Sequence, residues 1–203
     1  MAIEVHKGDL PADLDFGNSV AVDTETMGLK PKRDRLCVVQ LSAGDGNSHL
    51  VQFGRDGFNA PNLSALMTNP AVTKIFHFAR FDIATMRQHL SILCAPVYCT
   101  KIASKLVRTY TDRHGLKDLC RELLKIDLNK QQQSSDWGTE NLSKEQLEYA
   151  AADVLYLHQL KDRLDRMLAR ECRTHFANAC FAYLPVRAEL DLAGWSEEDI
   201  FAH

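Results

Sequence analysis

The sequence predicts an α/β protein with a mixed central sheet flanked by helices. Two features of the apolar pattern predict this architecture. Three short strand-like runs follow one another between residues 18 and 53, and strand-like and helix-like runs then alternate as far as residue 107. The length of 203 residues, with 45% hydrophobic and 25% charged side chains, is typical of one globular domain. We therefore expect a single domain over 1–203, with a core at about 18–170 and a helical C-terminal extension at 171–203.

The predicted strands lie in the first half of the chain. Residues 18–23 form a short apolar run that ends in Asp23, as a buried central strand would. Residues 36–41 and 48–53 form two more strands, and the Gly- and Asp-rich link between them predicts a tight hairpin. Two further strands are expected at 74–77 and 97–99.

Helices are predicted between and after these strands, at residues 63–67, 79–90, 102–107 and 116–124. A polar loop is expected at 127–141, and its length favours a functional role. A long helix then begins after Ser143, because Ser143 and Gln146 have the spacing of a capping box. Its buried stripe consists of Leu147, Ala151, Val154, Leu155 and Leu164.

Composition excludes several classes of protein. No apolar run is long enough for a membrane span, and the first residues lack the pattern of a signal peptide. The six cysteines show neither a CxxC pair nor zinc-ligand spacing, so we expect reduced thiols and a cytoplasmic protein.

Four acids and a tyrosine lie at positions from which their side chains could converge on one site. Asp23 and Glu25 are two residues apart at a strand end, so their side chains lie on one face. Asp82 lies at the start of a helix, and Tyr149 and Asp153 are one helical turn apart. Each pair alone is typical of solvated side chains, but together they predict a crowded carboxylate site that requires cations.

The residues Asp23-Thr-Glu-Thr-Met-Gly-Leu29, His77-Phe-Ala-Arg-Phe-Asp82 and Tyr149-Ala-Ala-Ala-Asp153 resemble the three exonuclease motifs of the DEDD superfamily, in its tyrosine branch. The resemblance covers about residues 18–170 and is greatest to RNase D-like enzymes, in particular the compact nano-RNase C group. The histidine branch would place His where this chain has Glu148, so the tyrosine branch is favoured.

The resemblance implies an RNase H-like exonuclease fold and two divalent cations, Mg²⁺ or Mn²⁺. It implies that Asp23 bridges both ions, that Glu25 and Asp153 complete the first site, and that Asp82 supports the second through water. Glu25 and Tyr149 are the expected catalytic residues, and Tyr149 would orient the attacking water.

Substrate contacts are also implied by the motifs. Thr24 and Thr26 are expected to bind the terminal nucleotide, and Leu29 to insert between the last two bases or else to pack its own loop. His77 would contact phosphate or sugar, or be satisfied by backbone. Trp137 would stack on a base or anchor its loop, and Lys130 would contact phosphate or remain solvated.

The leading functional hypothesis is a 3′→5′ exoribonuclease that degrades short oligoribonucleotides, with dinucleotides as the expected substrates, to 5′-mononucleotides. The alternatives are tRNA 3′ trimming, DNA-end hydrolysis, and an inactive RNA-binding scaffold. The formal charge of −3 argues against tight binding of long nucleic acid but not against a small site for a strand end. The resemblance also implies a homo-oligomer, an octamer in the nano-RNase C group.

Overall fold

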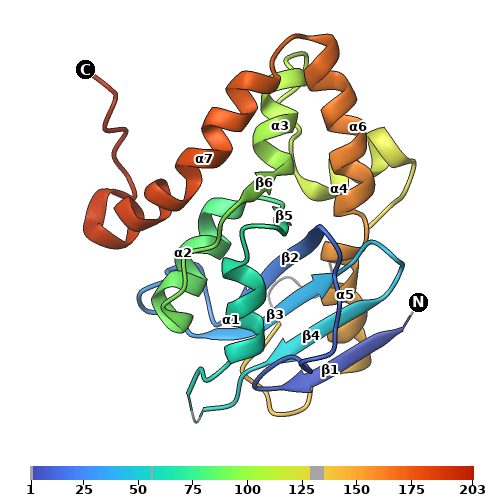
Figure 1. The fold of residues 1–203 in the computed structure, drawn as a ribbon, viewed down its shortest axis with the longest axis vertical. Helices are drawn as coiled ribbons and strands as arrows, with labels where there is room; N and C mark the ends of the chain where they lie inside the picture. Colours follow the sequence, from blue (N-terminus) through green and yellow to red (C-terminus); the bar gives the residue numbers. More distant parts are fainter. Residues whose placement is uncertain (1, 56, 129–134) are drawn as a thin grey trace.

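The computed structural model describes residues 2–55, 57–128 and 135–203, and it contains one six-stranded sheet with helices on both faces (Figure 1). The strand order is β1-β4-β3-β2-β5-β6. The strands are β1 (Ile3–Lys7), β2 (Ser19–Thr26), β3 (Leu36–Ser42), β4 (Ser48–Gln52), β5 (Thr73–Phe76) and β6 (Val97–Cys99). The pairs β2–β3 and β3–β4 are antiparallel, whereas β1–β4, β2–β5 and β5–β6 are parallel. The predicted mixed sheet is thus confirmed.

The helices are α1 (Pro61–Thr68), α2 (Ala79–Leu90), α3 (Thr100–Val107), α4 (Leu116–Leu119), α5 (Lys144–Leu155), α6 (Leu157–Arg170) and α7 (Thr174–Leu190). Two π-helical turns, η1 (Cys120–Leu124) and η2 (Asp191–Trp195), follow α4 and α7. Helix α5 packs on β1 to β4, whereas α2 packs on β2, β3, β5 and β6 and also contacts α7. In the part of the chain that is described, no helix has the length and apolar composition needed to cross a membrane.

The pairing and the bulge of strand β2 determine where its last residues point. Its first half pairs with β5, from Ser19 to Ala21, and its second half pairs only with β3. The register shifts between Glu25 and Thr26, and such a bulge bends a strand and re-aims its side chains. The carboxyl ends of β2 and β5 therefore open next to each other, where an α/β sheet commonly forms its ligand site.

Two predictions about elements were wrong. The strand β1 was not expected, because its only sheet partner, β4, lies more than forty residues away in the sequence and three of the five residues of β1 are exposed. The single long helix after Ser143 is instead two helices, α5 and α6, which meet at Tyr156. The chain bends there because α5 buries its apolar face on the sheet, whereas α6 packs on α3 and α7.

The C-terminal residues are helical, as expected, but Pro185 lies inside α7 and does not end it. Helix α7 packs mainly against α2. The division into a core at 18–170 and an extension at 171–203 stays a prediction. All six cysteines are free thiols.

The capping box at the start of α5 is present as predicted. Ser143 Oγ accepts a hydrogen bond from Gln146 N at 3.2 Å, and Gln146 Oε1 accepts one from Ser143 N at 2.9 Å. The Gln146 amide also donates to Ser135 Oγ and to the carbonyl of Asp136, so the cap ties the preceding loop to α5.

We predict that Ser143→Ala lowers the free energy of unfolding by about 1 kcal/mol, because one orphan amide at the start of α5 loses its acceptor. Urea denaturation followed by circular dichroism would measure the change. Ser64→Ala, within α1, is the matched control and should have a smaller effect. An unchanged midpoint for Ser143→Ala would contradict a stabilising cap.

Candidate active site

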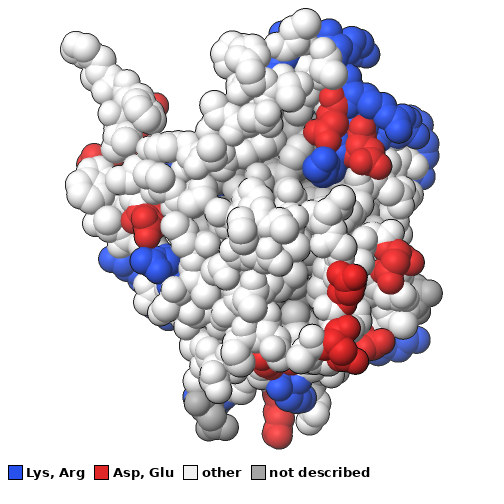
Figure 2. Space-filling view, viewed as in Figure 1, with Lys and Arg blue, Asp and Glu red and all other residues white. Residues whose placement is uncertain are grey.

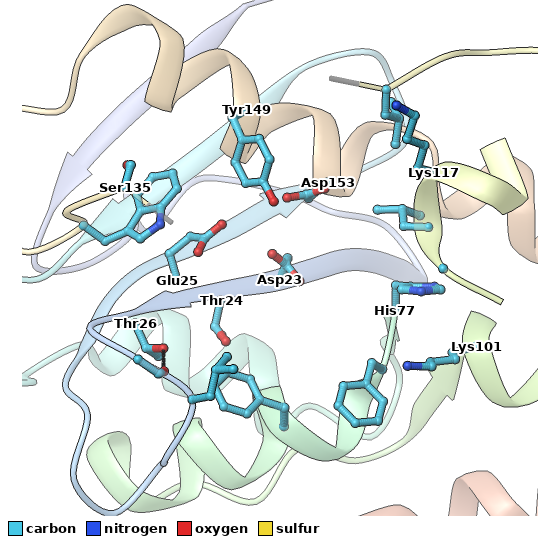
Figure 3. Close-up of a pocket in the computed structure, with 18 of the residues that line it drawn as sticks. Asp23, Thr24, Glu25, Thr26, His77, Lys101, Lys117, Ser135, Tyr149 and Asp153 are labelled. Carbon is cyan, nitrogen blue, oxygen red and sulfur yellow. Dashed lines mark hydrogen bonds between the residues drawn. The ribbon is translucent and has the colours of Figure 1, made fainter. Parts of the chain in front are cut away.

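Three acids from two elements meet above β2. Asp23 and Glu25 alternate with Thr24 along the strand, so both project toward α5, which carries Tyr149 and Asp153 (Figure 3). One carboxylate oxygen from each of Asp23, Glu25 and Asp153 lies within 4.8 Å of the others. The structure therefore brings together three of the four predicted acids.

The fourth acid, Asp82, lies on the Thr24 side of β2 and outside this group of three. It is almost fully buried in the first turn of α2. The Thr24 hydroxyl donates a hydrogen bond of 2.6 Å to Asp82 Oδ1. The Thr24 hydroxyl therefore holds Asp82, and the expectation that Thr24, which lines the pocket, binds substrate stays a prediction.

Burial and mutual repulsion disfavour ionisation of these carboxyl groups. Burial raises the pKa of Asp23 well above its usual range, and the charges of Asp82, Asp153 and Glu25 raise it further. Burial also raises the pKa of Glu25 to about 9, with Asp153 and Asp82 adding to the effect. The pKa of Asp82 rises to about 7 through burial, although the hydrogen bond from Thr24 opposes this rise. The fold therefore holds acids that ionise together only at a cost in free energy.

This donor set fits hard divalent cations. Carboxylate oxygens are the ligands that Mg²⁺ and Mn²⁺ prefer, and a bound cation offsets the repulsion that raises these pKa values. Asp23, Glu25 and Asp153 are the residues that could hold such an ion directly. Asp82 is close enough to raise the pKa of Asp23 by its charge, so it could support a neighbouring ion.

Tyr149 lies one turn before Asp153 on the same face of α5, and its hydroxyl points toward the carboxylates in Figure 3. Burial raises the pKa of its phenol above the usual range, and the charges of Asp153, Glu25 and Asp23 raise it further. The hydroxyl therefore keeps its proton at neutral pH. It is suited to orienting a water molecule by hydrogen bonding and not to acting as a base.

The carboxylates line one side of a pocket of about 580 Å³, and basic side chains line another. His77, Lys101 and Lys117 are spread along the side of the pocket away from Glu25 and Tyr149, with His77 between the two lysines (Figure 3). His77 Nδ1 lies 2.9 Å from the Thr100 hydroxyl, which in turn donates to the carbonyl of Phe76. A strand-end hydrogen-bond network thus fixes the His77 ring at the pocket wall.

Phe78 continues this wall in a left-handed backbone conformation, with φ of 71°, at the start of α2. Such a conformation is unfavourable for a bulky residue and is concentrated at functional sites. The ammonium group of Lys101 lies 4.1 Å from the centre of the Phe78 ring, so a cation–π contact holds it beside the pocket.

The loop after β2 forms the rim. Leu29 is 85% exposed and Met27 is 52% exposed, yet both line the pocket. The Thr26 hydroxyl donates to the carbonyl of Gly28, a bond that shapes the loop. Met27 approaches Gly138, where a Cβ atom would lie 2.6 Å from its sulfur. The exposure of Leu29 favours the wedge interpretation over packing within its own loop.

Trp137 anchors its loop, which was one of the two expected alternatives. It is 2% exposed and packs with Cys37, Val38, Leu50 and Ala150. Its ring centre lies 6.0 Å from that of Tyr149, so it also supports the tyrosine from behind. Lys130 lies outside the described residues.

Several residues of the pocket were not predicted: Met27, Phe78, Phe81, Lys101, Leu116, Lys117, Leu128 and Ser135. Lys101 and Lys117 are the most informative of these, because they supply positive charge opposite the acids. No sequence motif marks them, since they come from α3 and α4 and reach the site only through tertiary folding.

Comparison with known proteins agrees with this geometry. The family model described as "3'-5' exonuclease" matches residues 8–169. Ribonuclease D of Acidiphilium cryptum (strain JF-5) is 37% identical over 154 residues, which are 76% of this chain and 39% of that relative. The chain therefore spans well under half the length of this curated relative.

Two solved structures of NrnC from Brucella melitensis match the whole chain. NrnC bound to pGG is 56% identical with a TM-score of 0.97, and the match covers 100% of this chain and 99% of that one. NrnC with bound Mg²⁺ is 55% identical with a TM-score of 0.96, and the match covers 100% of both chains. These findings confirm the predicted RNase H-like exonuclease fold and the resemblance to RNase D-like proteins near NrnC. Because the matched residues 8–169 include β2, α2 and α5 with every acid of the site, this chain belongs to the 3′–5′ exonuclease family.

Proposed function

We propose that this protein is a metal-dependent 3′→5′ exoribonuclease that degrades short oligoribonucleotides, dinucleotides above all, to 5′-mononucleotides. The observation that carries the proposal is that one pocket is lined by both acidic and basic side chains. Asp23, Glu25 and Asp153 stand at one side with Tyr149, and basic side chains stand opposite. Cations at the acids would hold the scissile phosphate, and the basic side chains would hold a second phosphate of the same small molecule.

Each acid has a role that follows from its position. The family resemblance implies that Asp23 would bridge two ions, and its carboxylate lies beside those of Glu25 and Asp153 while the charge of Asp82 also acts on its pKa. Glu25 and Asp153 would complete the first site on the α5 side, and Asp82, held by the Thr24 hydroxyl, would support the second ion through water. Two divalent cations would supply Lewis-acid activation of a water and stabilisation of the leaving 3′ oxygen.

Tyr149 orients the attacking water through its hydroxyl, and Trp137 behind it limits the motion of the phenol ring. Leu29 and Met27 offer apolar surface to the bases at the 3′ end, as exposed side chains at a pocket rim do in single-strand recognition. We accordingly propose the tyrosine-branch chemistry of the DEDD superfamily for this chain.

The preference for short substrates has three supports. The pocket volume of about 580 Å³ is within the range of small-molecule sites. On the face drawn in Figure 2, basic side chains gather near α6 with acidic ones among them, and no continuous basic band crosses the described residues on that face. A long strand would need such a band. The relative NrnC has been solved bound to pGG, which is consistent with a two-nucleotide ligand.

The alternative substrates, the inactive scaffold and the oligomeric state remain to be considered. Trimming of tRNA and hydrolysis of DNA ends use the same chemistry and differ only in substrate. An inactive scaffold is disfavoured, because the described site retains all four acids and Tyr149. A homo-oligomer, an octamer by resemblance, stays a prediction, and the exposed Trp195, Ile200 and Phe201 of the C-terminal segment are consistent with an interface.

We predict that Glu25→Gln raises the melting temperature of the metal-free protein at pH 8 by about 3 °C or more. The pKa of Glu25 is about 9 in the fold against an ordinary 4.5, so the folded state retains a proton that the unfolded chain releases. The wild type should therefore lose stability as pH rises from about 4.5 toward 9, and the variant should lose less.

Differential scanning fluorimetry in EDTA between pH 5 and 9 would test this prediction. Added Mn²⁺ should stabilise the wild type more than Glu25→Gln. The exposed Glu148, on α5, provides the control Glu148→Gln, which should follow the wild type. Equal pH profiles for wild type and Glu25→Gln would rule out the proposed repulsion.

We predict that Asp153→Asn abolishes hydrolysis while leaving the fold intact, because a metal-holding oxygen is lost without a change of side-chain size. The assay uses labelled RNA and DNA of two to about twenty nucleotides, with Mn²⁺ or with EDTA. Wild type should hydrolyse the RNA dinucleotide fastest, and Glu148→Gln should match it. Residual wild-type activity in Asp153→Asn would refute the metal assignment, and faster cleavage of long RNA would refute the preference for short substrates.

We predict that Lys101→Met and Lys117→Met each raise KM about 10-fold or more for a dinucleotide with a 5′-phosphate, since each removes a charge-assisted hydrogen bond. The effect should be much smaller for the same dinucleotide with a 5′-hydroxyl. Lys105→Met, one turn further along α3, is the control because Lys105 does not line the pocket. An equal rise in KM for both substrates would show that these lysines do not bind that phosphate.

A further inference from the structure

A second group of metal-ligating side chains lies at the opposite edge of the sheet from β6. Glu4 and His6 alternate with Val5 on β1, so both project to one face. The neighbouring strand β4 places His49 directly beside Glu4 in the parallel register. Three potential ligands from two strands thus share one face, with β3 and β4 separating β1 from the carboxylate-bearing β2 (Figure 1).

The ligand atoms of these residues converge. His6 Nε2 lies 3.1 Å from His49 Nδ1, and Glu4 Oε2 lies 3.6 Å from the same nitrogen. One ligand atom from each of the three residues lies within 4.8 Å of the others. The two imidazole rings are stacked, with centres 5.4 Å apart and planes inclined by 18°.

Hydrogen bonding joins only two members of this group, the two histidines. A ring nitrogen of neutral histidine either donates one hydrogen or accepts one, so His49 Nδ1 serves one neighbour at a time. The 3.6 Å separation from Glu4 is too long for a hydrogen bond. A single cation that replaces the proton shared by the two rings would, after a small shift of the rings, bind all three residues.

The spacing matches a tetrahedral metal of the zinc class. Zinc–nitrogen bonds of about 2.0–2.1 Å in tetrahedral geometry separate the ligand atoms by about 3.3–3.4 Å. The observed 3.1 and 3.6 Å bracket that separation. Two imidazoles and one carboxylate form a known ligand set for Zn²⁺, and imidazole ligands select against Mg²⁺.

We propose that Glu4, His6 and His49 form a Zn²⁺-binding site that links the edge strand β1 to β4, separate from the carboxylate site. The His49 side chain is only 14% exposed, and the ring of Phe16 packs edge-on against it, so one ligand is already held in place. The Glu4 side chain is 56% exposed, which leaves access for the ion and for a water as fourth ligand.

The two sites are expected to prefer different metals, because their ligand atoms differ. Oxygen ligands at Asp23, Glu25 and Asp153 favour Mg²⁺ or Mn²⁺, whereas the nitrogen ligands of His6 and His49 favour zinc. Bound Zn²⁺ would add a cross-link between β1 and β4, and ligands that bind the folded state alone stabilise it. The expected consequence is greater stability of the N-terminal strand.

Metal analysis after equilibrium dialysis of the full chain against Zn²⁺ tests the proposal, with excess Mg²⁺ present to fill the carboxylate site. His6→Gln and His49→Gln should each bind one Zn²⁺ per chain less than the wild type, with affinity at this site reduced more than about 100-fold. His175→Gln, an exposed histidine on α7, is the control and should match the wild type. Circular dichroism and melting in EDTA verify that the variants fold. His6 is the safer variant, because it lies on the edge strand.

Co²⁺ substitution gives a second measurement that does not depend on activity. A tetrahedral site with nitrogen ligands should give visible d–d absorption, which His6→Gln and Glu4→Gln weaken or abolish. Absorption that persists in His6→Gln, or a thiolate charge-transfer band pointing to Cys172 or Cys180, would overturn the proposal. Zn²⁺ content equal in wild type and both histidine variants would overturn it as well.

Discussion

Repulsion among buried carboxylates is the constraint on which the rest of this structure depends. Asp23, Glu25 and Asp153 converge in a half-buried space, and Asp82 adds charge from the other side of β2. A fold tolerates such a group only if surrounding elements hold it rigidly and if cations neutralise it.

Three local features position the carboxylates and the helix that faces them. The bulge at Glu25 and Thr26 sets the direction of β2, the Thr24 hydroxyl fixes Asp82, and the Ser143 cap fixes the start of α5. Gln146 takes part in the cap and also binds the loop that carries Trp137. The loop, the helix and the catalytic tyrosine proposed here are therefore positioned by one continuous set of contacts.

In the proposed reaction, the acidic and basic side chains of the pocket would serve different parts of a small substrate. Acids and cations suit the phosphate to be cleaved, whereas Lys101 and Lys117 suit a phosphate that only needs to be held. The acids and these lysines line the same pocket. The same principle of sorting by ligand type separates the carboxylate site from the His6 and His49 group on β1.

The sequence by itself determined the α/β architecture, most strand and helix positions, and the acids and tyrosine of the site, because these are written in local periodicity and in short motifs such as Asp23-Thr-Glu. It did not reveal β1, the break at Tyr156, or Lys101 and Lys117. Only the tertiary structure decided these, and it also turned Thr24 toward Asp82 and buried Trp137. The physical reason is that strand pairing, helix packing and the direction of a side chain depend on partners far away in the sequence, which no local pattern records.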